Sequence, residues 1–216
     1  MRPVIARFLP AAVLAATLLH SGPAASEPVS AYTEFDFEKG CVTIETNPMG
    51  GTWQCPGYGG YPVVFSEGDL RQTVFYGHLG TWYAAGAWAS FGGFNHVGGT
   101  IEWRMAEAGG PPLAAIQRWF VADAASDSGE EKLQVLVISK VGQPGEGEAC
   151  VVGYVDALAN KDANVIARQV ADEVAPGFAC RRTEPQWHGV KGANAPAAFV
   201  GYTEESDPGT EEMPEE

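Results

Sequence analysis

Short runs of alternating or β-branched residues, each closed by a polar turn, constrain the fold of this chain more than any other feature. Residues 41–45 read Cys-Val-Thr-Ile-Glu, and residues 101–106 alternate large apolar side chains with charged or small ones. A period of two is the pattern of a half-buried β-strand. The connections between neighbouring runs are short, whereas parallel neighbours need long crossovers. The sequence therefore predicts an antiparallel meander.

Similar runs mark the remaining strands of the predicted sheet. They lie at residues 53–55, 61–65, 71–77, 115–122, 133–141 and 150–155. Residues 135–138 are apolar on both faces, which is typical of a strand in the centre of a sheet. By contrast, residues 27–39 form a polar lead. Residues 77–99 combine glycines and aromatics without a clear period, which indicates an ordered loop.

A helix is predicted after the last of these runs. Asn160 is placed to cap it, and Asp162 lies in the first turn, where the helix dipole favours an acid. One apolar stripe follows, formed by Ala163, Ile166, Ala167, Val170 and Val174. Pro176 and Gly177 end the helix. The fold class expected is α+β, mainly an antiparallel β-sheet with one helix packed on it and stabilised by disulfides.

Residues 1–26 have the layout of a secretory signal peptide. Arg2 and Arg7 supply the positive start, and residues 8–19 are almost entirely apolar. Small residues follow, and the small-x-small rule places the cleavage near Glu27. A retained membrane anchor is the alternative, but a membrane span needs roughly 20 apolar residues, more than this run provides. We therefore expect an exported protein, periplasmic or secreted, with no transmembrane segment after cleavage.

Four cysteines lie beyond this leader, at Cys41, Cys55, Cys150 and Cys180. An even number of cysteines behind a signal peptide indicates disulfides formed in an oxidising compartment. Three pairings are possible. We favour Cys41 with Cys55 and Cys150 with Cys180, because each pair closes a short loop around a local unit. The chain has no Cys-x-x-Cys spacing, so structural zinc and a thioredoxin-like redox centre are both disfavoured.

The rest of the chain has the size of one domain with a tail. Residues 27–190 are expected to form a single globular domain. Beyond Lys191 there is no basic residue, while acids gather among Gly, Pro and Thr, so residues 191–216 are expected to be an acidic disordered tail. The formal net charge is −14. Basic residues are few and scattered, so no nucleic-acid partner is expected.

No local motif identifies a reaction. The chain contains no Gly-x-Ser-x-Gly elbow, His-Glu-x-x-His motif, phosphate-binding loop, dinucleotide fingerprint or EF-hand loop. We therefore assign no catalytic residue, no metal ligand and no cofactor from the sequence.

Two polar groups are still candidates for general acid–base chemistry. The first contains Glu67, Asp69, Arg71 and His78, and the second contains Glu102 and Arg104. A histidine can act as a general base near neutral pH when an acid lies beside it. Solvated surface charges and ion pairs are the simpler interpretation of both groups.

Aromatic density is the strongest non-random feature of the sequence. The rings between residues 53 and 103 belong to Trp53, Tyr58, Tyr61, Phe65, Phe75, Tyr76, Trp82, Tyr83, Trp88, Phe91, Phe94 and Trp103. Such rings can stack on sugars or surround an apolar ligand. The candidate ligand-binding residues are Trp82, Tyr83, Trp88 and Trp103. The alternative is that these rings fill the core, since aromatic residues suit β-proteins.

Several short stretches form a recognisable set. They are Glu-Gly-Asp-Leu-Arg at 67–71, Phe-Asn at 94–95 followed by Ile-Glu-Trp-Arg at 101–104, and Tyr-Val-Asp-Ala at 154–157 followed by Phe-Ala-Cys at 178–180. This set resembles a group of uncharacterised exported proteins of alphaproteobacteria, over most of the chain after residue 26. The group carries no assigned activity, so the resemblance implies a periplasmic location and no mechanism.

These observations favour a non-enzymatic binding or envelope-associated module. Its partner would be an unknown small molecule, a glycan or an envelope protein. The alternative is a hydrolase acting on carbohydrate or cell wall, in which Asp69, His78 and Glu102 would have to converge beside the aromatic segment. A carbohydrate-binding module without catalysis is a third hypothesis, and it predicts Trp or Tyr rings exposed in a row.

Overall fold

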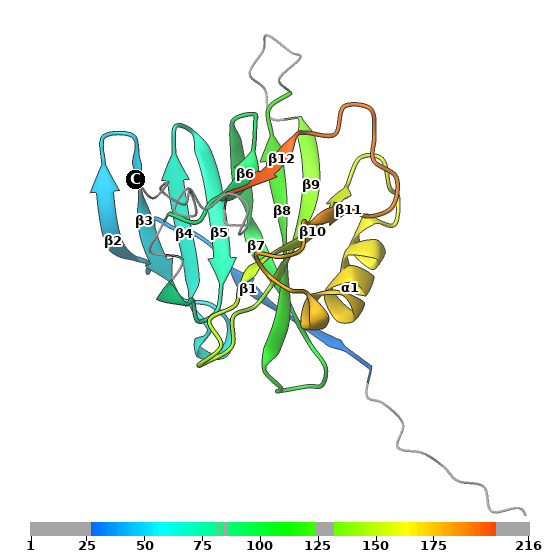
Figure 1. The fold of residues 1–216 in the computed structure, drawn as a ribbon, viewed down its shortest axis with the longest axis horizontal. Coiled ribbons are helices and arrows are strands. Elements are labelled where there is room, and N and C mark those ends of the chain that lie inside the picture. The colour runs from blue at the N-terminus through cyan, green and yellow to red at the C-terminus, as the bar shows by residue number, and fades with distance from the viewer. Residues whose placement is uncertain (1–26, 82, 84–85, 124–131, 202–216) are drawn as a thin grey trace, which may run out of the picture.

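Two large β-sheets and a helix build the part of the chain that the computed structural model describes, residues 27–81, 83, 86–123 and 132–201 (Figure 1). A six-stranded sheet has the order β1-β7-β8-β9-β10-β11, and a four-stranded sheet has the order β2-β3-β4-β5. Strands β6 and β12 form a separate pair. Neighbouring strands run antiparallel, except that β11 is parallel to β10. The expected fold class is confirmed.

The element boundaries follow the short runs of the sequence. The strands are β1 (Val29–Glu34), β2 (Val42–Asn47), β3 (Gly50–Cys55), β4 (Val63–Gly68), β5 (Arg71–Tyr76), β6 (Ala89–Phe91), β7 (Asn95–Met105), β8 (Pro112–Val121), β9 (Leu133–Lys140), β10 (Cys150–Asp156), β11 (Gln186–Trp187) and β12 (Ala198–Val200). The α-helix is α1 (Ala163–Glu173), and short 3-10 turns lie at η1 (Tyr58–Gly60) and η3 (Ala175–Gly177).

The six-stranded sheet and helix α1 form the aliphatic part of the core. Every residue of β10 is buried, as are residues 135–139 of β9, in keeping with the central position expected for this run. The helix packs against β8, β9 and β10. Its buried residues are Ala163, Ala167, Val170 and Ala171. Because three of these are alanines, the helix backbone can lie close to the sheet, and burial of the apolar stripe stabilises the pair.

The four-stranded sheet turns one face to an aromatic cluster. The ring of Phe65 is fully buried, with its centroid 5.5 Å from that of Phe35 and 4.8 Å from that of Phe37. Between the sheets, Tyr76 of β5 meets Trp103 of β7 edge to face, with 5.7 Å between ring centroids. Such edge contacts add to the stabilisation that burial alone provides. Much of the aromatic density therefore belongs to the core.

Two disulfides join Cys41 to Cys55 and Cys150 to Cys180, the pairing favoured from the sequence. The first links the residue before β2 to the last residue of β3, its hydrogen-bonded neighbour. The second ties the first residue of β10 to the segment that follows α1. The described residues contain no free cysteine. This framework fits a protein that matures outside the reducing cytosol.

Two regions that the sequence left without strands contain them. Residues 29–34, expected as a polar lead, form β1 and pair along β7 from Met105 to Thr100. The expected ordered loop at 77–99 contains β6 and the first residues of β7. Both were missed because their strands are short or half-exposed, so they do not show an apolar alternation.

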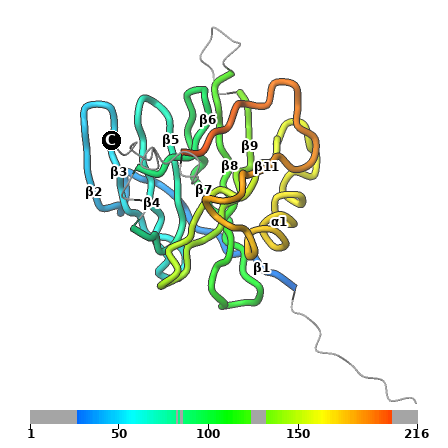
Figure 2. The backbone as a smooth tube through the Cα atoms, in the orientation of Figure 1, coloured from blue at the N-terminus to red at the C-terminus, as the bar shows by residue number. Residues whose placement is uncertain are grey.

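The segment after α1 belongs to the folded domain. Strand β11 lies beside β10, and β12 pairs with β6. Figure 2 shows this orange to red segment returning across the molecule from the helix side to β6. The expected start of a disordered tail at residue 191 is therefore wrong for residues 191–201. Residues 202–216 and the predicted signal peptide at 1–26 lie outside the described residues.

Asn160 does not cap α1, contrary to the expectation. The N-cap position belongs to Asp162, whose side chain makes no capping hydrogen bond. The Asn160 side chain is buried and instead donates to the carbonyl oxygens of Asp156 and Val190, both at 2.8 Å. It also accepts from the Val190 N–H at 2.9 Å. Asn160 thus holds the returning C-terminal segment against the end of β10.

Candidate ligand-binding groove

A groove of about 590 Å³ runs over the face of the four-stranded sheet that points away from the aromatic core. This volume lies in the range of small-ligand sites. The lining comes from strands β2 to β5 and from described residues between β5 and β6. The groove forms because smaller polar side chains lie in the middle of this face and larger apolar ones lie around them.

The floor of the groove is a row of polar side chains that crosses three strands of the sheet. The strand register aligns Glu45 of β2, Thr52 of β3 and Ser66 of β4. Since neighbouring residues of a strand point to opposite faces, this row lies opposite the buried Phe65. The hydroxyls of Thr52 and Ser66 are 3.0 Å apart, and Thr52 Oγ1 lies 3.5 Å from Glu45 Oε1. Gly68, which ends β4, adds no side chain, and Cη2 of the Trp88 indole lies 3.6 Å from the position that a Cβ would take there.

Larger apolar side chains form the walls of the groove. Ile44 and Met49 contribute from the β2 edge. Tyr83 and Trp88 contribute from the segment after β5, and the Tyr83 ring meets Phe75 edge to face with 4.7 Å between centroids. The groove therefore combines a hydrogen-bonding floor with aromatic and aliphatic walls.

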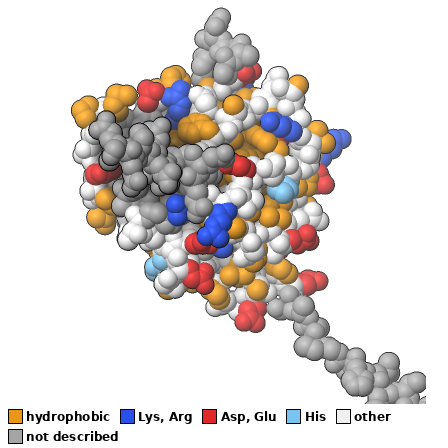
Figure 3. All heavy atoms as spheres, viewed as in Figure 1, with side chains coloured by type: hydrophobic (Ala, Val, Ile, Leu, Met, Phe, Trp, Pro, Cys, Tyr) orange, Lys and Arg blue, Asp and Glu red, His pale blue; other side chains and the backbone are white. Residues whose placement is uncertain are grey.

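The charge of the lining limits what the groove can hold. Among its described residues, the charged ones are Glu45 and Glu67, and none is basic. The Glu67 carboxylate accepts a hydrogen bond from Gln72 Nε2 at 3.1 Å. Elsewhere, Lys and Arg side chains are dispersed over the face shown in Figure 3. The lining thus disfavours anions and suits a neutral or positively charged molecule that has both polar groups and an apolar face.

The structure separates the four candidate ligand-binding aromatics. Trp88 and Tyr83 line the groove. The prediction of a ligand-binding role is wrong for Trp103. This residue is fully buried and its indole N–H donates to Thr33 Oγ1 at 2.8 Å, so no external ligand can reach it. Trp82 lies outside the described residues. Aromatic content alone could not distinguish a wall residue from a core residue.

The three residues of the hydrolase hypothesis do not come together. Asp69 precedes β5 and His78 follows it, so the two lie beyond opposite ends of that strand. Asp69 pairs with Arg71 at 2.6 Å, and the His78 ring meets Tyr61 edge to face. Glu102 is part of β7 in the other sheet. With its three residues in separate places, the hypothesis loses the convergent geometry that it requires.

Glu102 and Arg104 have a structural role between β7 and helix α1. Glu102 accepts from Arg168 Nε at 2.6 Å, and Ser30 Oγ donates to the same carboxylate. Arg104 binds both carboxylate oxygens of Asp172, at 2.9 and 2.6 Å. These charge-assisted bonds fasten the helix to β1 and β7.

Sequence reasoning missed the floor residues Glu45, Thr52 and Ser66. They are ordinary strand residues, and only the register of three strands brings them into one row. A period of two shows which residues share a face, but it does not show that short side chains will meet across strands. The alternation around Phe65 was the available signal, since it separates an inner from an outer face.

No family model, curated protein or solved structure matches this chain. Among the described residues, no group of three or more His, Cys, Asp or Glu is arranged to hold a metal ion. The same residues include no helix long and apolar enough to span a membrane.

Proposed function

We propose that this chain is an exported, non-catalytic binding protein and that the groove holds its ligand. The observation that carries the proposal is the hydroxyl row of Thr52 and Ser66 lying between the apolar walls at Trp88 and Ile44. A floor of this kind can exchange hydrogen bonds with ligand hydroxyls, while an indole can cover a sugar ring. The class of ligand that fits best is a neutral glycan.

The two disulfides support a location in the periplasm or the extracellular medium. The layout of residues 1–26 and the resemblance to exported proteins point the same way. A glycan is an abundant molecule at a cell envelope, so compartment and ligand class are consistent. No observation favours the hydrolase alternative.

The test is a calorimetric titration of the mature protein with the tetramer of β-1,4-linked N-acetylglucosamine, a neutral probe. We expect measurable binding that Thr52→Val weakens by a factor of about 2 to 10, because one hydrogen bond is lost. Trp88→Ala should weaken it by about tenfold or more, because a stacking surface is lost.

Thr43→Val is the matched control. Thr43 is an exposed residue of β2 that pairs with Trp53 and so lies on the other face of the sheet. Its affinity should equal that of the unchanged protein. Failure of the neutral tetramer to bind, wild-type affinity in Trp88→Ala, or equal affinity for a polyanionic galacturonate oligomer would each contradict the proposal.

A further inference from the structure

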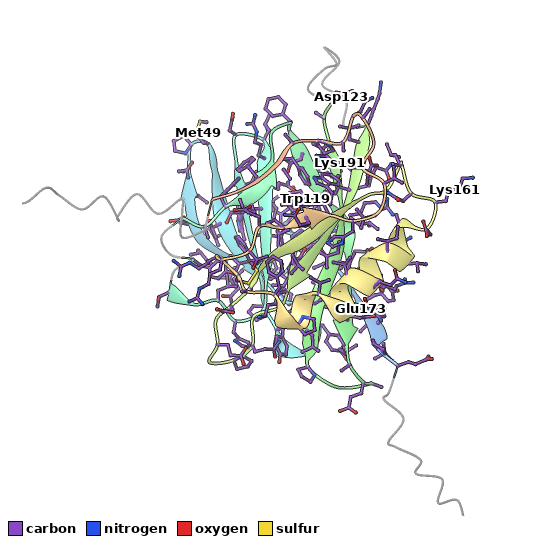
Figure 4. The ribbon with its side chains drawn as sticks, turned by 45° about the vertical axis from the view of Figure 1, so that its right-hand side comes forward. Met49, Trp119, Asp123, Lys161, Glu173 and Lys191 are labelled. Atoms are coloured by element: carbon purple, nitrogen blue, oxygen red, sulfur yellow. A yellow bond between two sulfur atoms is a disulfide. The ribbon has the colours of Figure 1, made fainter. Side chains whose placement is uncertain are left out.

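Three exposed apolar side chains stand on neighbouring turns. Met49 in the β2–β3 turn, Leu70 in the β4–β5 turn and Phe94 before β7 are 62%, 60% and 43% exposed. Backbone hydrogen bonds join these turns, since Asp69 N donates to Met49 O and Asn95 N donates to Leu70 O. Figure 1 shows the β2–β3 and β4–β5 turns at the same edge, and Figure 4 shows Met49 at the outer end of its hairpin. We call Met49, Leu70 and Phe94 the apolar tip cluster.

Leu70 has a backbone conformation that leucine rarely adopts. Its φ is 59°, in the left-handed region, and it is the second residue of a two-residue hairpin turn where glycine is usual. The side chain gains little burial in return. A bulky apolar residue held exposed at a strained position is an observation from which a function can be inferred.

Backbone carbonyls around the tips already have partners inside the protein. Besides the two bonds above, Phe94 O accepts from Ala122 N, Gly93 O from Asn95 Nδ2, and Gly92 O from Arg71 Nε. Water can satisfy the carbonyls of an ordinary surface turn, whereas a turn that enters an apolar phase must satisfy them internally. These five carbonyls therefore meet a requirement of insertion that solvent exposure alone does not impose.

The charges beside the tips indicate which surface they fit. Arg71 and Asp69 form an ion pair, and the Arg71 guanidinium lies 5.1 Å from the centre of the Phe94 ring. The pair is internally compensated, and the whole chain has a net charge of −14, so an anionic membrane would repel it. A stable protein interface buries about 800 Å² per partner and involves roughly 20 to 30 residues on each side, more than the three residues of the cluster provide.

We propose that the apolar tip cluster inserts into the interface of a zwitterionic lipid bilayer. Leu70 and Phe94 enter the boundary between headgroups and acyl chains, and Arg71 stays at the level of the headgroups. Met49 also lines the groove, so this docking would hold one end of the groove at the membrane surface. The inference does not depend on the identity of the groove's ligand.

The test is co-sedimentation of the mature protein with phosphatidylcholine vesicles. The unchanged protein should bind, and Leu70→Gly should lower the partition coefficient by about tenfold or more, because one large side chain no longer leaves water. The same variant should have a Tm equal to or above that of the unchanged protein, because glycine fits the left-handed conformation. Phe94→Ala should also weaken binding. Lost binding with retained stability separates insertion from misfolding.

Val42→Ala is the matched control, since Val42 is 68% exposed but begins β2, at the opposite end of that strand from the β2–β3 turn. It should leave vesicle binding unchanged. The proposal is overturned if the unchanged protein does not bind phosphatidylcholine, if Leu70→Gly binds as well as the unchanged protein, or if Val42→Ala weakens binding as much. A concentration-dependent dimer that Leu70→Gly abolishes would assign the cluster to self-association and would equally overturn it.

Discussion

At the scale of single residues, Asn160 shows how one buried amide can fix a long segment. It satisfies both the N–H and the carbonyl of Val190 and also binds the carbonyl of Asp156. The sequence suggested a helix cap because asparagine precedes an apolar stripe. The structure uses the same hydrogen-bonding groups for a tertiary contact 30 residues away along the chain.

Replacing Asn160 by alanine should therefore destabilise the protein. Asn160→Ala removes three hydrogen bonds and leaves the Asp156 carbonyl without this partner. We expect the free energy of unfolding to fall by about 1 to 3 kcal/mol. Urea unfolding followed by circular dichroism measures this change.

Asp162→Ala is the control for this prediction. Asp162 holds the N-cap position without a side-chain hydrogen bond, so its loss should change the free energy of unfolding by under about 0.5 kcal/mol. A larger loss of unfolding free energy in Asp162→Ala than in Asn160→Ala would contradict this account. It would show that a cap at the start of the helix matters more than the tertiary contacts of Asn160.

We expect the attachment of α1 to depend on pH through Glu102, whose carboxylate binds Arg168 of the helix. Burial alone would raise the pKa of the Glu102 carboxyl, but hydrogen bonds from Arg168 and Ser30 and the charges of Arg168 and Arg104 lower it below its ordinary value of 4.5. A carboxyl with a lowered pKa in the folded state stabilises that state above its unfolded pKa. This contribution is lost as the pH falls through the folded-state pKa.

The predicted result is a free energy of unfolding that declines as the pH drops below about 4.5, with a smaller decline in Glu102→Gln. Other acids titrate in both proteins, so the difference between the two curves isolates Glu102. Urea unfolding at a series of pH values from neutral to acidic supplies both curves. Parallel curves would show that Glu102 does not contribute to the acid sensitivity.

At the scale of elements, the sequence predicted the strands and the helix that have a clear apolar pattern. The centre of β9 is buried on both faces, and its continuous apolar run predicted this central position. Helix α1 was found from one apolar stripe. Strand β1 was missed because hydrogen bonds to β7, rather than an apolar face, determine it. The groove floor was not predicted for a similar reason. The sequence of one strand does not determine which of its residues align with those of the neighbouring strands.

The two disulfides should differ in their resistance to reduction. Cys150 and Cys180 are both buried, whereas Cys41 is partly exposed. Because thiol–disulfide exchange requires access of the attacking thiolate to sulfur, the bridge between Cys41 and Cys55 should open first. Partial reduction of the native protein, alkylation and peptide mass spectrometry should find the label on Cys41 and Cys55 before the other pair. Earlier labelling of Cys150 or Cys180 would contradict this order.

At the scale of the whole molecule, the two sheets contribute differently to the core and to the surface. The six-stranded sheet, with α1 on it, supplies a buried core and the ion pairs that fasten the helix. The four-stranded sheet turns Phe65 into the core, and its other face is covered at β5, where Phe75 is buried, but hollowed over β2 to β4 between large side chains. A recessed polar floor between apolar walls is the feature on which the proposed binding function rests.

The most direct test of this account is a residue-resolved NMR titration of the mature protein with the neutral β-1,4-linked N-acetylglucosamine tetramer. Binding in the groove predicts that the largest amide shifts cluster at Thr52, Ser66, Gly68 and Trp88, while residues of β9 and β10 stay unchanged. Shifts confined to other surfaces, or none at saturating glycan, would contradict the groove as the ligand site.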